Sequence, residues 1–390
     1  MQKMTVEKLY TYYKAHPNIS TDTRNIKLDS IFFALKGDNF NGNEFAHQAL
    51  EKGATYAVVD EEKYCISEKY LLVEDVLESL QQLAKYHRNQ LKIPFIGITG
   101  SNGKTTTKEL IHAVLSQKYK TLATHGNLNN HIGVPLTLLS IREEHQMAVI
   151  EMGANHMKEI EFLSNICSPD FGIITNIGKA HLEGFGSEEN IAKGKSELYT
   201  HIKQKAGLLF VNADDSKVMQ LSEGIKRICY GSSNSSDFIA EYKGSEPFVC
   251  LQLNSLRSKP IVNSSIIGKY NFDNCVAAAC IGNYFGVDET AIVHALESYV
   301  PSNNRSQVMQ KGSNTILMDA YNANPSSMEV ALANFSSMKS EKKLAILGDM
   351  LELGSESEVE HQHIADKALA SKNTRVILIG PNFQKIKTSA

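Results

Sequence analysis

The sequence has no long hydrophobic run. Nowhere do about 18 consecutive apolar residues occur, the length that a membrane-spanning helix needs. Residues Met1 to Lys14 are polar, with acidic and tyrosine side chains where a signal peptide would need an apolar stretch. We therefore expect a cytoplasmic protein that does not insert into membranes.

The sequence also lacks an excess of charge of either sign and any cysteine motif. Its 40 basic and 43 acidic residues give a net charge of −3 with no basic block, which argues against nucleic acid as the main partner. A local cradle for an anionic ligand remains compatible with this balance. The six cysteines are scattered without a C-x-x-C pair, so we expect buried, reduced thiols.

The length of 390 residues, at about 150 per domain, predicts two to three domains. We place boundaries near Ile93-Pro94, where proline interrupts a helical pattern, and at the polar linker after Val300. The predicted domains are 1–92, 93–300 and 301–390. Each shows short apolar runs alternating with helical stretches, which is typical of an α/β fold.

Short, almost wholly apolar runs predict parallel strands that are covered on both faces. In the middle domain these runs are Phe95 to Thr99, Met147 to Ile150, Phe171 to Thr175 and Leu208 to Val211. The polar, serine-rich stretch from Ser232 to Ser265 predicts short strands that form an antiparallel edge of the sheet. A third strand–helix rhythm predicts strands at Thr315 to Met318, Leu344 to Leu347 and Val376 to Ile379.

The sharpest local signal is the run from Gly100 to Thr106, GSNGKTT, which directly follows a predicted strand and opens a helix. Glycines let backbone N–H groups approach phosphate oxygens, and the helix N-terminus adds its positive dipole end. Lys104 would reach the β- and γ-phosphates, and the Thr105 hydroxyl would ligate Mg²⁺. The spacing departs from the standard Walker pattern, because Ile98 stands where that pattern has glycine.

Two further predicted strands end in residues that suit a metal–phosphate site. Glu151 follows one, and His181 lies shortly after the other. Ligands of open α/β sheets gather at the carboxyl ends of strands, so both side chains should lie near Lys104. The chemistry alone leaves two interpretations open: Mg²⁺ ligation, or a solvated carboxylate and an ordinary imidazole.

Three other polar motifs are ambiguous. Lys193 and Lys195, two apart on a predicted helix, taken alone indicate a solvated basic face. The stretch from His125 to His131 is too polar for a core and is either a binding loop or an ordinary one. The run from Asp319 to Ser327 begins at a strand end and would either grip a nucleotide or cap the next helix.

Five motifs in register resemble those of the Mur ligase family, over nearly the whole chain. They are TGSNGKTT at 99–106, EMGAN at 151–155, AHLEGFGS at 180–187, YNANP at 321–325 and LGDMLELG at 347–354. The resemblance implies a three-domain α/β fold. A small N-terminal domain would bind the UDP end of a precursor, a central P-loop ATPase-type domain with a mostly parallel sheet would bind ATP, and a C-terminal Rossmann-like domain would close over the site.

The resemblance also implies roles for individual residues. The catalytic set would be Lys104, Lys195, His181 and Glu151, with Thr105, Glu151, His181 and Lys195 around two Mg²⁺ ions and a carbamate on Lys195. ATP would contact Gly100, Ser101, Asn102, Gly103, Lys104, Thr105, Thr106, Asn271, Asn274, Arg305, Asp319, Tyr321 and Asn322. The substrate set would be Ser20, Thr21, Asp22, Thr23, Arg24, Lys36, Asn41, His125, Asn127, Asn129, Asn130 and Asp349.

The activity that the resemblance implies is ATP-dependent amide formation in peptidoglycan precursor synthesis. D-alanyl-D-alanine would be added to UDP-N-acetylmuramoyl-tripeptide through an acyl phosphate, by a protein expected to be a monomer. Alternatives are a sibling ligase that adds one amino acid, a folylpolyglutamate-synthase-like ligase, and a non-catalytic P-loop protein. A P-loop GTPase is disfavoured, since no guanine-reading Asn-Lys-x-Asp occurs.

By the same resemblance, the third domain should continue beyond the strand at Val376 to Ile379. We therefore expect a shortened Rossmann-like domain with a sheet edge and apolar helix faces uncovered.

Overall fold

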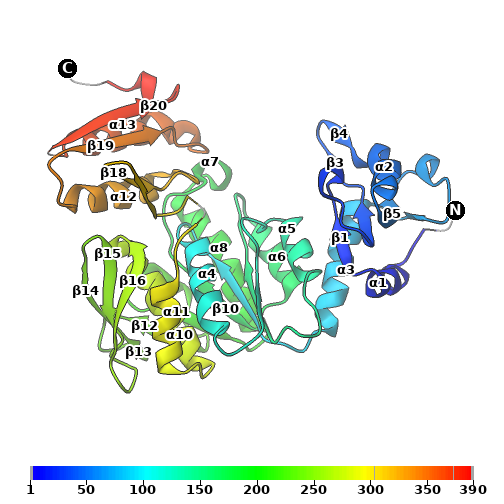
Figure 1. The fold of residues 1–390 in the computed structure, drawn as a ribbon, viewed down its shortest axis with the longest axis horizontal. Coiled ribbons are helices and arrows are strands. Elements are labelled where there is room, and N and C mark those ends of the chain that lie inside the picture. The colour runs from blue at the N-terminus through cyan, green and yellow to red at the C-terminus, as the bar shows by residue number, and fades with distance from the viewer. Residues whose placement is uncertain (1–2, 303, 372, 388–390) are drawn as a thin grey trace.

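The computed structural model describes residues 3–302, 304–371 and 373–387. Three lobes follow one another along the chain, and the two termini lie at opposite ends of an elongated molecule (Figure 1). Among the described residues, none of the helices combines the length and the apolar character required to cross a bilayer.

The N-terminal lobe is a four-stranded parallel sheet in the order β1-β2-β5-β6. Its helices pack on this sheet, and its buried strand residues include Phe33 and Val58. The elements are α1 (Val6–Ala15), β1 (Asn18–Ser20), β2 (Ser30–Phe33), β3 (Lys36–Gly37), β4 (Phe40–Asn41), α2 (Ala46–Glu51), β5 (Ala54–Val59), β6 (Tyr70–Leu72) and α3 (Val76–Gln90).

The N-terminal and central lobes share one hydrophobic core. A single cluster of buried side chains runs from Leu9 and Phe33 through Leu80 and Leu83 of α3 to Ile150 and its neighbours in the central lobe. Arg88 of α3 extends this junction with hydrogen bonds to the backbone oxygens of Cys167 and Ser168, both at 2.8 Å. We infer that α3 holds the two lobes in a fixed relation.

The central lobe contains a seven-stranded parallel sheet in the order β13-β12-β11-β10-β7-β9-β8. The four apolar runs in the sequence all form strands of this sheet, and their side chains are buried on both faces, as predicted. The strands are β7 (Phe95–Thr99), β8 (Thr121–Ala123), β9 (Met147–Glu151), β10 (Phe171–Ile174), β11 (Leu208–Asn212), β12 (Arg227–Gly231) and β13 (Phe238–Ile239).

Helices cover both faces of this sheet (Figure 1). One face belongs to the hydrophobic core that also contains α3. The other face is covered by a second hydrophobic cluster, built largely from α4, α10 and the strands. The helices are α4 (Lys104–Leu115), α5 (Gly133–Leu138), α6 (Glu159–Cys167), α7 (Leu182–Phe185), α8 (Glu188–Gln204), α9 (Ser216–Leu221), α10 (Phe272–Tyr284) and α11 (Glu289–Ser298).

The serine-rich stretch corrects one prediction. Its strands β14 (Glu241–Ser245), β15 (Phe248–Gln252) and β16 (Ile261–Ile267) are antiparallel, but they form a separate three-stranded sheet rather than an edge of the large one. The actual edge strand is β13, which pairs in parallel with β12. The separate sheet buries Val249 and Leu251 in the hydrophobic cluster that α10 shares with one face of the large sheet.

The C-terminal lobe corrects a second prediction. The strand at 315–318 is part of β18 (Asn314–Met318), which pairs with β17 (Gln307–Lys311) in a two-stranded antiparallel hairpin. The strand–helix rhythm begins only after it, with α12 (Pro325–Ser337), β19 (Lys343–Gly348), α13 (Ser357–Leu369) and β20 (Thr374–Ile379), whose two strands pair in parallel.

One face of the β19–β20 pair is uncovered. Leu344, Ile346, Ile377 and Ile379 are all about half exposed, whereas Ala345 and Leu347 on the opposite face pack in the core of this lobe. The sequence predicted an uncovered sheet edge and uncovered apolar helix faces in this lobe, whereas these four side chains lie on a face of the sheet.

Candidate functional site

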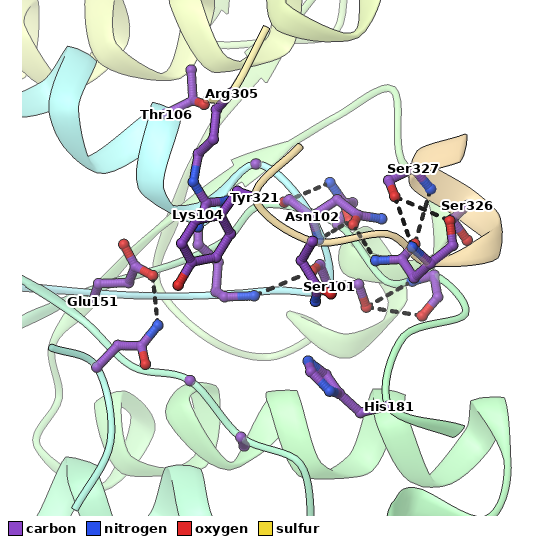
Figure 2. A pocket seen from close by; sticks show the side chains of 18 of the residues that line it. Ser101, Asn102, Lys104, Thr106, Glu151, His181, Arg305, Tyr321, Ser326 and Ser327 are labelled. Atoms are coloured by element: carbon purple, nitrogen blue, oxygen red, sulfur yellow. Dashed lines mark hydrogen bonds between the residues drawn. The ribbon is translucent and has the colours of Figure 1, made fainter. Parts of the chain in front are cut away.

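The phosphate loop joins the end of β7 to the start of α4 (Figure 2). Gly103 is the N-cap residue with φ of 79°, and Gly100 has φ of 145°. A Cβ atom on Gly100 would lie 2.0 Å from Thr175 Oγ1, so only glycine fits there. The loop therefore brings free helix N–H groups to the carboxyl end of the sheet, as an anion cradle requires.

Lys104 is folded over this loop. Its Nζ donates to the backbone oxygens of Gly100 at 2.7 Å and Ser101 at 3.1 Å. Burial lowers the pKa of Lys104 to about 8, and the carboxylate of Glu151 opposes that shift. The loop thus holds the ammonium close to the place that a phosphate would occupy. Because the group is buried, keeping it charged without a nearby anion costs free energy.

Glu151 ends β9 beside the loop, and its side chain is only 1% exposed. One carboxylate oxygen, Oε1, accepts hydrogen bonds from Thr105 Oγ1 at 3.2 Å and Asn129 Nδ2 at 2.8 Å. The other, Oε2, is buried without a hydrogen-bond partner in the described part of the chain. A buried carboxylate oxygen without a partner is costly, so this atom fits a cation ligand.

Thr105 and Glu151 supply the oxygen ligands that Mg²⁺ prefers. In residues 3–302, 304–371 and 373–387 there is no group of three or more His, Cys, Asp or Glu side chains that could hold a metal by themselves. Mg²⁺ is typically bound by one or two protein oxygens together with substrate phosphates and water. The donor set therefore fits a nucleotide-bound Mg²⁺ rather than a resident metal.

The loop opens into a cavity of about 740 Å³ between the central and C-terminal lobes. This volume lies in the range typical of small-ligand sites. Fifteen of the predicted site residues line it: Ser101, Asn102, Gly103, Lys104, Thr106, Asn129, Asn130, Glu151, His181, Asn271, Asn274, Arg305, Asp319, Tyr321 and Asn322. Residues more than 150 positions apart in sequence thus converge on one site.

The C-terminal lobe contacts the phosphate loop directly. Asn102 Oδ1 accepts a hydrogen bond of 2.8 Å from Asn324 Nδ2, and Asn324 is also the N-cap of α12 (Figure 2). Lys179 forms an ion pair of 2.7 Å with Glu360 of α13. The predicted capping role of the 319–327 run is therefore confirmed for Asn324, which also joins the two lobes.

His181 lines the cavity and is hydrogen-bonded through Nδ1 to the Glu352 carboxylate of the C-terminal lobe. Burial lowers its pKa, against the opposing effect of Glu352. A neutral imidazole is the form that ligates metals, but here one ring nitrogen is already engaged.

The two asparagines of α10 and its preceding turn are tightly bound within the protein. Asn274 Oδ1 accepts from Thr107 Oγ1 at 2.8 Å, and Asn274 Nδ2 donates to Asn271 Oδ1 at 2.8 Å. Asn271 in turn donates to the backbone oxygen of Ile267. This chain of bonds fixes α10 against the phosphate-loop helix and leaves both residues at the cavity wall.

Arg305 and Tyr321 form the wall on the side of the C-terminal lobe. The Arg305 guanidinium carbon lies 3.7 Å from the centroid of the Tyr321 ring, a cation–π geometry, and Figure 2 shows the pair beside Lys104. Arg305 Nε is buried without a hydrogen-bond partner in the described part of the chain. A flat, cationic surface of this kind suits an aromatic base or a phosphate.

Comparison with family models assigns all three lobes. Residues 17–88 match the "Mur ligase family, catalytic domain", residues 98–282 the "Mur ligase middle domain", and residues 304–390 the "Mur ligase, glutamate ligase domain". The chain is 36% identical to the UDP-N-acetylmuramoyl-tripeptide–D-alanyl-D-alanine ligase of Bacillus subtilis, over 93% of this chain and 79% of that one. The corresponding Escherichia coli ligase is 35% identical, with 95% and 83% covered.

The chain belongs to the Mur ligase family.

Solved structures agree with this assignment. MurF from Acinetobacter baumannii superposes with a TM-score of 0.86 at 32% identity, covering 99% of this chain and 89% of that one. MurF from Thermotoga maritima, solved in complex with ADP, gives a TM-score of 0.83 at 27% identity, covering 95% and 88%. A folylpolyglutamate synthase from Mycobacterium tuberculosis, at 16% identity and a TM-score of 0.59, shares the fold alone.

Lys195 of this Mur ligase corrects a third prediction. It is not part of a solvated basic face: Lys193 is exposed, whereas Lys195 is 0% exposed, because residues two apart on a helix point to different sides. Its Nζ donates to the backbone oxygen of Ala154 at 2.9 Å and lies 5.2 Å from the centre of the Phe185 ring. Burial lowers the pKa of Lys195 well below its usual value.

The predicted UDP-site residues lie in the N-terminal lobe and not in the cavity. Lys36 pairs with Asp60 at 2.8 Å and Glu61 at 3.1 Å, and Asn41 donates to Glu61 at 2.8 Å. Neither acidic residue was predicted, since only the fold brings them to the β3–β4 hairpin. The other predicted residues, Ser20 to Arg24, follow β1, where Asp22 and Arg24 pair with each other.

Four predicted substrate residues either lie outside the cavity or are engaged in contacts within the protein. Asn130 lines the cavity but uses Oδ1 to accept the N–H groups of Ile132 and Gly133 at the start of α5. His125 and Asn127 belong to the same loop without lining the cavity, so only Asn129 and Asn130 of this group reach it. Asp349 lies outside the cavity, where its carboxylate accepts backbone N–H groups at 382 and 383.

Sequence reasoning gave no individual role to several residues at the site. Tyr270 lines the cavity and its hydroxyl lies 2.6 Å from Ser306 Oγ, and His131, Ser326 and Ser327 also line the cavity. The last three belong to the 125–131 stretch and the 319–327 run, which the sequence had marked as candidate motifs. Nothing in the sequence marks Tyr270 or Ser306, because their proximity depends on how the two lobes pack.

Proposed function

We propose that this Mur ligase adds D-alanyl-D-alanine to UDP-N-acetylmuramoyl-tripeptide, with ATP cleaved to ADP and phosphate, in peptidoglycan precursor synthesis. The observation that carries the proposal is the phosphate loop beside the unpartnered Glu151 oxygen, in a cavity shared by two lobes. The names of the Bacillus subtilis and Escherichia coli relatives support the substrate assignment.

ATP would place its phosphates on the N–H groups of the 100–106 loop. Lys104 would then leave its two backbone carbonyls for the β- and γ-phosphates, whose negative charge stabilises the ammonium. The base and ribose would lie toward Asn271, Asn274 and the Arg305–Tyr321 pair, with Asp319 and Asn322 completing the wall. The ADP complex of the Thermotoga maritima relative supports nucleotide binding by this fold.

Thr105, Glu151, His181 and Lys195 are the residues that would hold two Mg²⁺ ions. When bound, the ions neutralise phosphate charge and polarise the transferred phosphoryl group. Glu151 Oε2 is ready for that role, whereas His181 would use the ring nitrogen that does not face Glu352. Lys195 would contribute as a carbamate, which converts a buried cation into a bidentate anion.

Burial favours that modification. Carbamate formation needs a neutral amine, and burial stabilises the neutral form of Lys195. In the reaction the Nζ atom bonds to the carbon of CO₂ and releases one proton.

The chemistry follows from these positions. The terminal carboxylate of the tripeptide attacks the γ-phosphorus of ATP, the bond to the β-phosphate oxygen breaks, and ADP leaves. The free amine of D-alanyl-D-alanine then attacks the acyl carbon, phosphate departs, and the amine loses a proton. Lys104 offsets the negative charge that develops as carboxylate and triphosphate approach.

The C-terminal lobe would exclude water from the acyl phosphate. Contacts such as Asn324 with Asn102 and Lys179 with Glu360 hold that lobe over the loop. The UDP end of the substrate would lie on the N-terminal lobe at Ser20 to Arg24, Lys36 and Asn41. The peptide would pass along the 125–130 loop, and Asp349 would support the acceptor side.

We further propose that the enzyme acts as a cytoplasmic monomer.

The experiment that tests the function is identification of the product by mass spectrometry. Purified protein is incubated with ATP, Mg²⁺, UDP-muramoyl-tripeptide and a panel of acceptors: D-alanyl-D-alanine, D-alanine and L-glutamate. We expect a product only with the dipeptide. A product with L-glutamate and none with the dipeptide would assign the chain to a sibling activity.

A further inference from the structure

Lys108 is a buried charge that the proposed mechanism does not use. It lies on α4 one turn after Lys104, and its side chain is only 2% exposed. Lysine is almost never fully buried without a partner, because removing an ammonium from water is costly. A helix that only needed packing at this position would be served by an apolar residue.

The contacts of Lys108 include the predicted site residue Glu151. Its Nζ donates to the backbone oxygen of Gly126 at 3.2 Å. The same atom lies 3.9 Å from Glu151 Oε2 and 3.9 Å from Glu109 Oε1. Glu151 Oε2 is the carboxylate oxygen that has no hydrogen-bond partner in the described residues.

The two oxygens of Glu151 therefore have different neighbours. Oε1 is bound by Thr105 and by Asn129 of the 125–131 loop, whereas Oε2 faces the charge of Lys108. Because Lys108 also holds the Gly126 carbonyl, it ties the loop that carries Asn129 to the phosphate-loop helix. One ammonium thus faces an oxygen of Glu151 and also holds the loop that carries the neutral partner of Glu151.

We propose that Lys108 is a positioning residue of this ligase, which orients the Glu151 carboxylate for the cation that accompanies ATP. The proposal rests on the proposed function, in which Glu151 faces that cation. Lys108 itself touches neither nucleotide nor substrate; it acts through Glu151 and through the loop.

The neighbouring Glu109 extends this cluster toward the C-terminal lobe. The Tyr299 hydroxyl donates to the Glu109 carboxylate, and Tyr299 directly follows α11, at the start of the connection to that lobe. Lys108 and Glu109 thereby link the Glu151 carboxylate to Tyr299, where the connection to the C-terminal lobe begins.

The test compares Lys108→Met, Lys108→Gln and Lys108→Arg with wild type, and uses Lys120→Met as a matched control at an exposed lysine. Two quantities are measured: the dissociation constant of ADP by calorimetry, in EDTA and in excess Mg²⁺, and the Mg²⁺ concentration that half-saturates ADP release under full substrate. Thermal denaturation checks that each variant folds.

For Lys108→Met and Lys108→Gln we expect the half-saturating Mg²⁺ concentration to rise about 10- to 100-fold, the loss typical of groups that orient metal ligands. ADP affinity in EDTA should stay within about threefold of wild type, because Lys108 touches no nucleotide. Lys108→Arg should recover most of the Mg²⁺ dependence. Lys108→Gln keeps a donor for Gly126 and therefore remains informative if Lys108→Met does not fold.

An unchanged Mg²⁺ requirement in a folded Lys108→Gln or Lys108→Met would overturn the proposal, as would an equal loss of ADP affinity with and without Mg²⁺. These outcomes differ from failure of the proposed function. In that case wild type itself would show no Mg²⁺-dependent ADP binding and no turnover.

Discussion

Replacing Lys104 by methionine removes one charge from the phosphate loop and keeps nearly the same side-chain length. The Lys104 ammonium is held by two backbone carbonyls of the loop, at 2.7 and 3.1 Å. At an effective dielectric constant of about 20, a unit charge about 4 Å from a phosphate oxygen contributes about 4 kcal/mol. Removing one preorganised donor of this kind typically costs about 10²–10³ in kcat.

We therefore expect Lys104→Met to lower kcat by about 10²–10³-fold, or about 2.7–4 kcal/mol of transition-state stabilisation. Its effect on folding should be smaller. Two hydrogen bonds of about 0.5–1.5 kcal/mol each are lost, which is well below the 5–15 kcal/mol typical of a folded domain. Since burial already disfavours the charge, part of that loss is offset.

The assay is coupled ADP release at saturating substrates, with Lys193→Met as the surface control and circular dichroism to confirm the fold. Lys193 is exposed on α8 and makes no contact with the cavity. A folded Lys104→Met enzyme within about fivefold of the wild-type kcat would refute the placement of the phosphates on this loop, given the loss expected for such a donor.

Three further outcomes are expected. Because the pKa of Lys104 is lowered to about 8, its protonated form dominates at pH 7 and is the minor form at pH 9, so kcat/KM for ATP should fall as pH rises through 8; a profile flat to pH 10 would contradict this. Activity after removal of CO₂ should drop and return with bicarbonate in wild type and Lys193→Ala, but not in Lys195→Ala; a fully active Lys195→Ala would contradict the carbamate. Asn324→Ala should lose the hydrogen bond to Asn102 and the N-cap of α12. We expect urea denaturation to show an unfolding free energy of the C-terminal lobe that is lower by about 0.5–2 kcal/mol, and KM for ATP to rise. An unchanged denaturation midpoint and an unchanged KM would contradict both roles.

Much of the central sheet could be predicted because its strands are buried on both faces. Runs such as Phe95 to Thr99 carry a local signal that needs no knowledge of neighbours. The hairpin β17–β18 has a weaker local signal in the sequence. None of the residues of Gln307–Lys311 or of its partner strand is fully buried, so the pairing is set by local register rather than by a core. The three-stranded sheet was detected, but its separation from the large sheet depends on packing against α10.

The candidate site also has parts that the sequence predicts and parts that it does not. The phosphate loop could be found from sequence because its glycines and lysine are contiguous and their geometry is dictated locally. The pairing of His181 with Glu352 joins residues 171 positions apart, and no short pattern encodes it. Lys108 looked like a helix residue of no special kind, because its burial beside Glu151 is visible only once β9 and α4 are packed together.

Lys195 shows how a local pattern can mislead. Two lysines two positions apart suggested a solvated face, yet helix geometry separates them and buries only one. The burial of Lys195 follows from the way α8 packs, with its Nζ near the Phe185 ring.

The central claim is that this chain couples ATP cleavage to the joining of two specific substrates. The measurement that tests it most directly is phosphate release with ATP and Mg²⁺, in parallel reactions that omit UDP-muramoyl-tripeptide, D-alanyl-D-alanine or neither. We predict release only when both are present. Release that is unaffected by omitting the dipeptide, or no release from the complete mixture, would contradict the account.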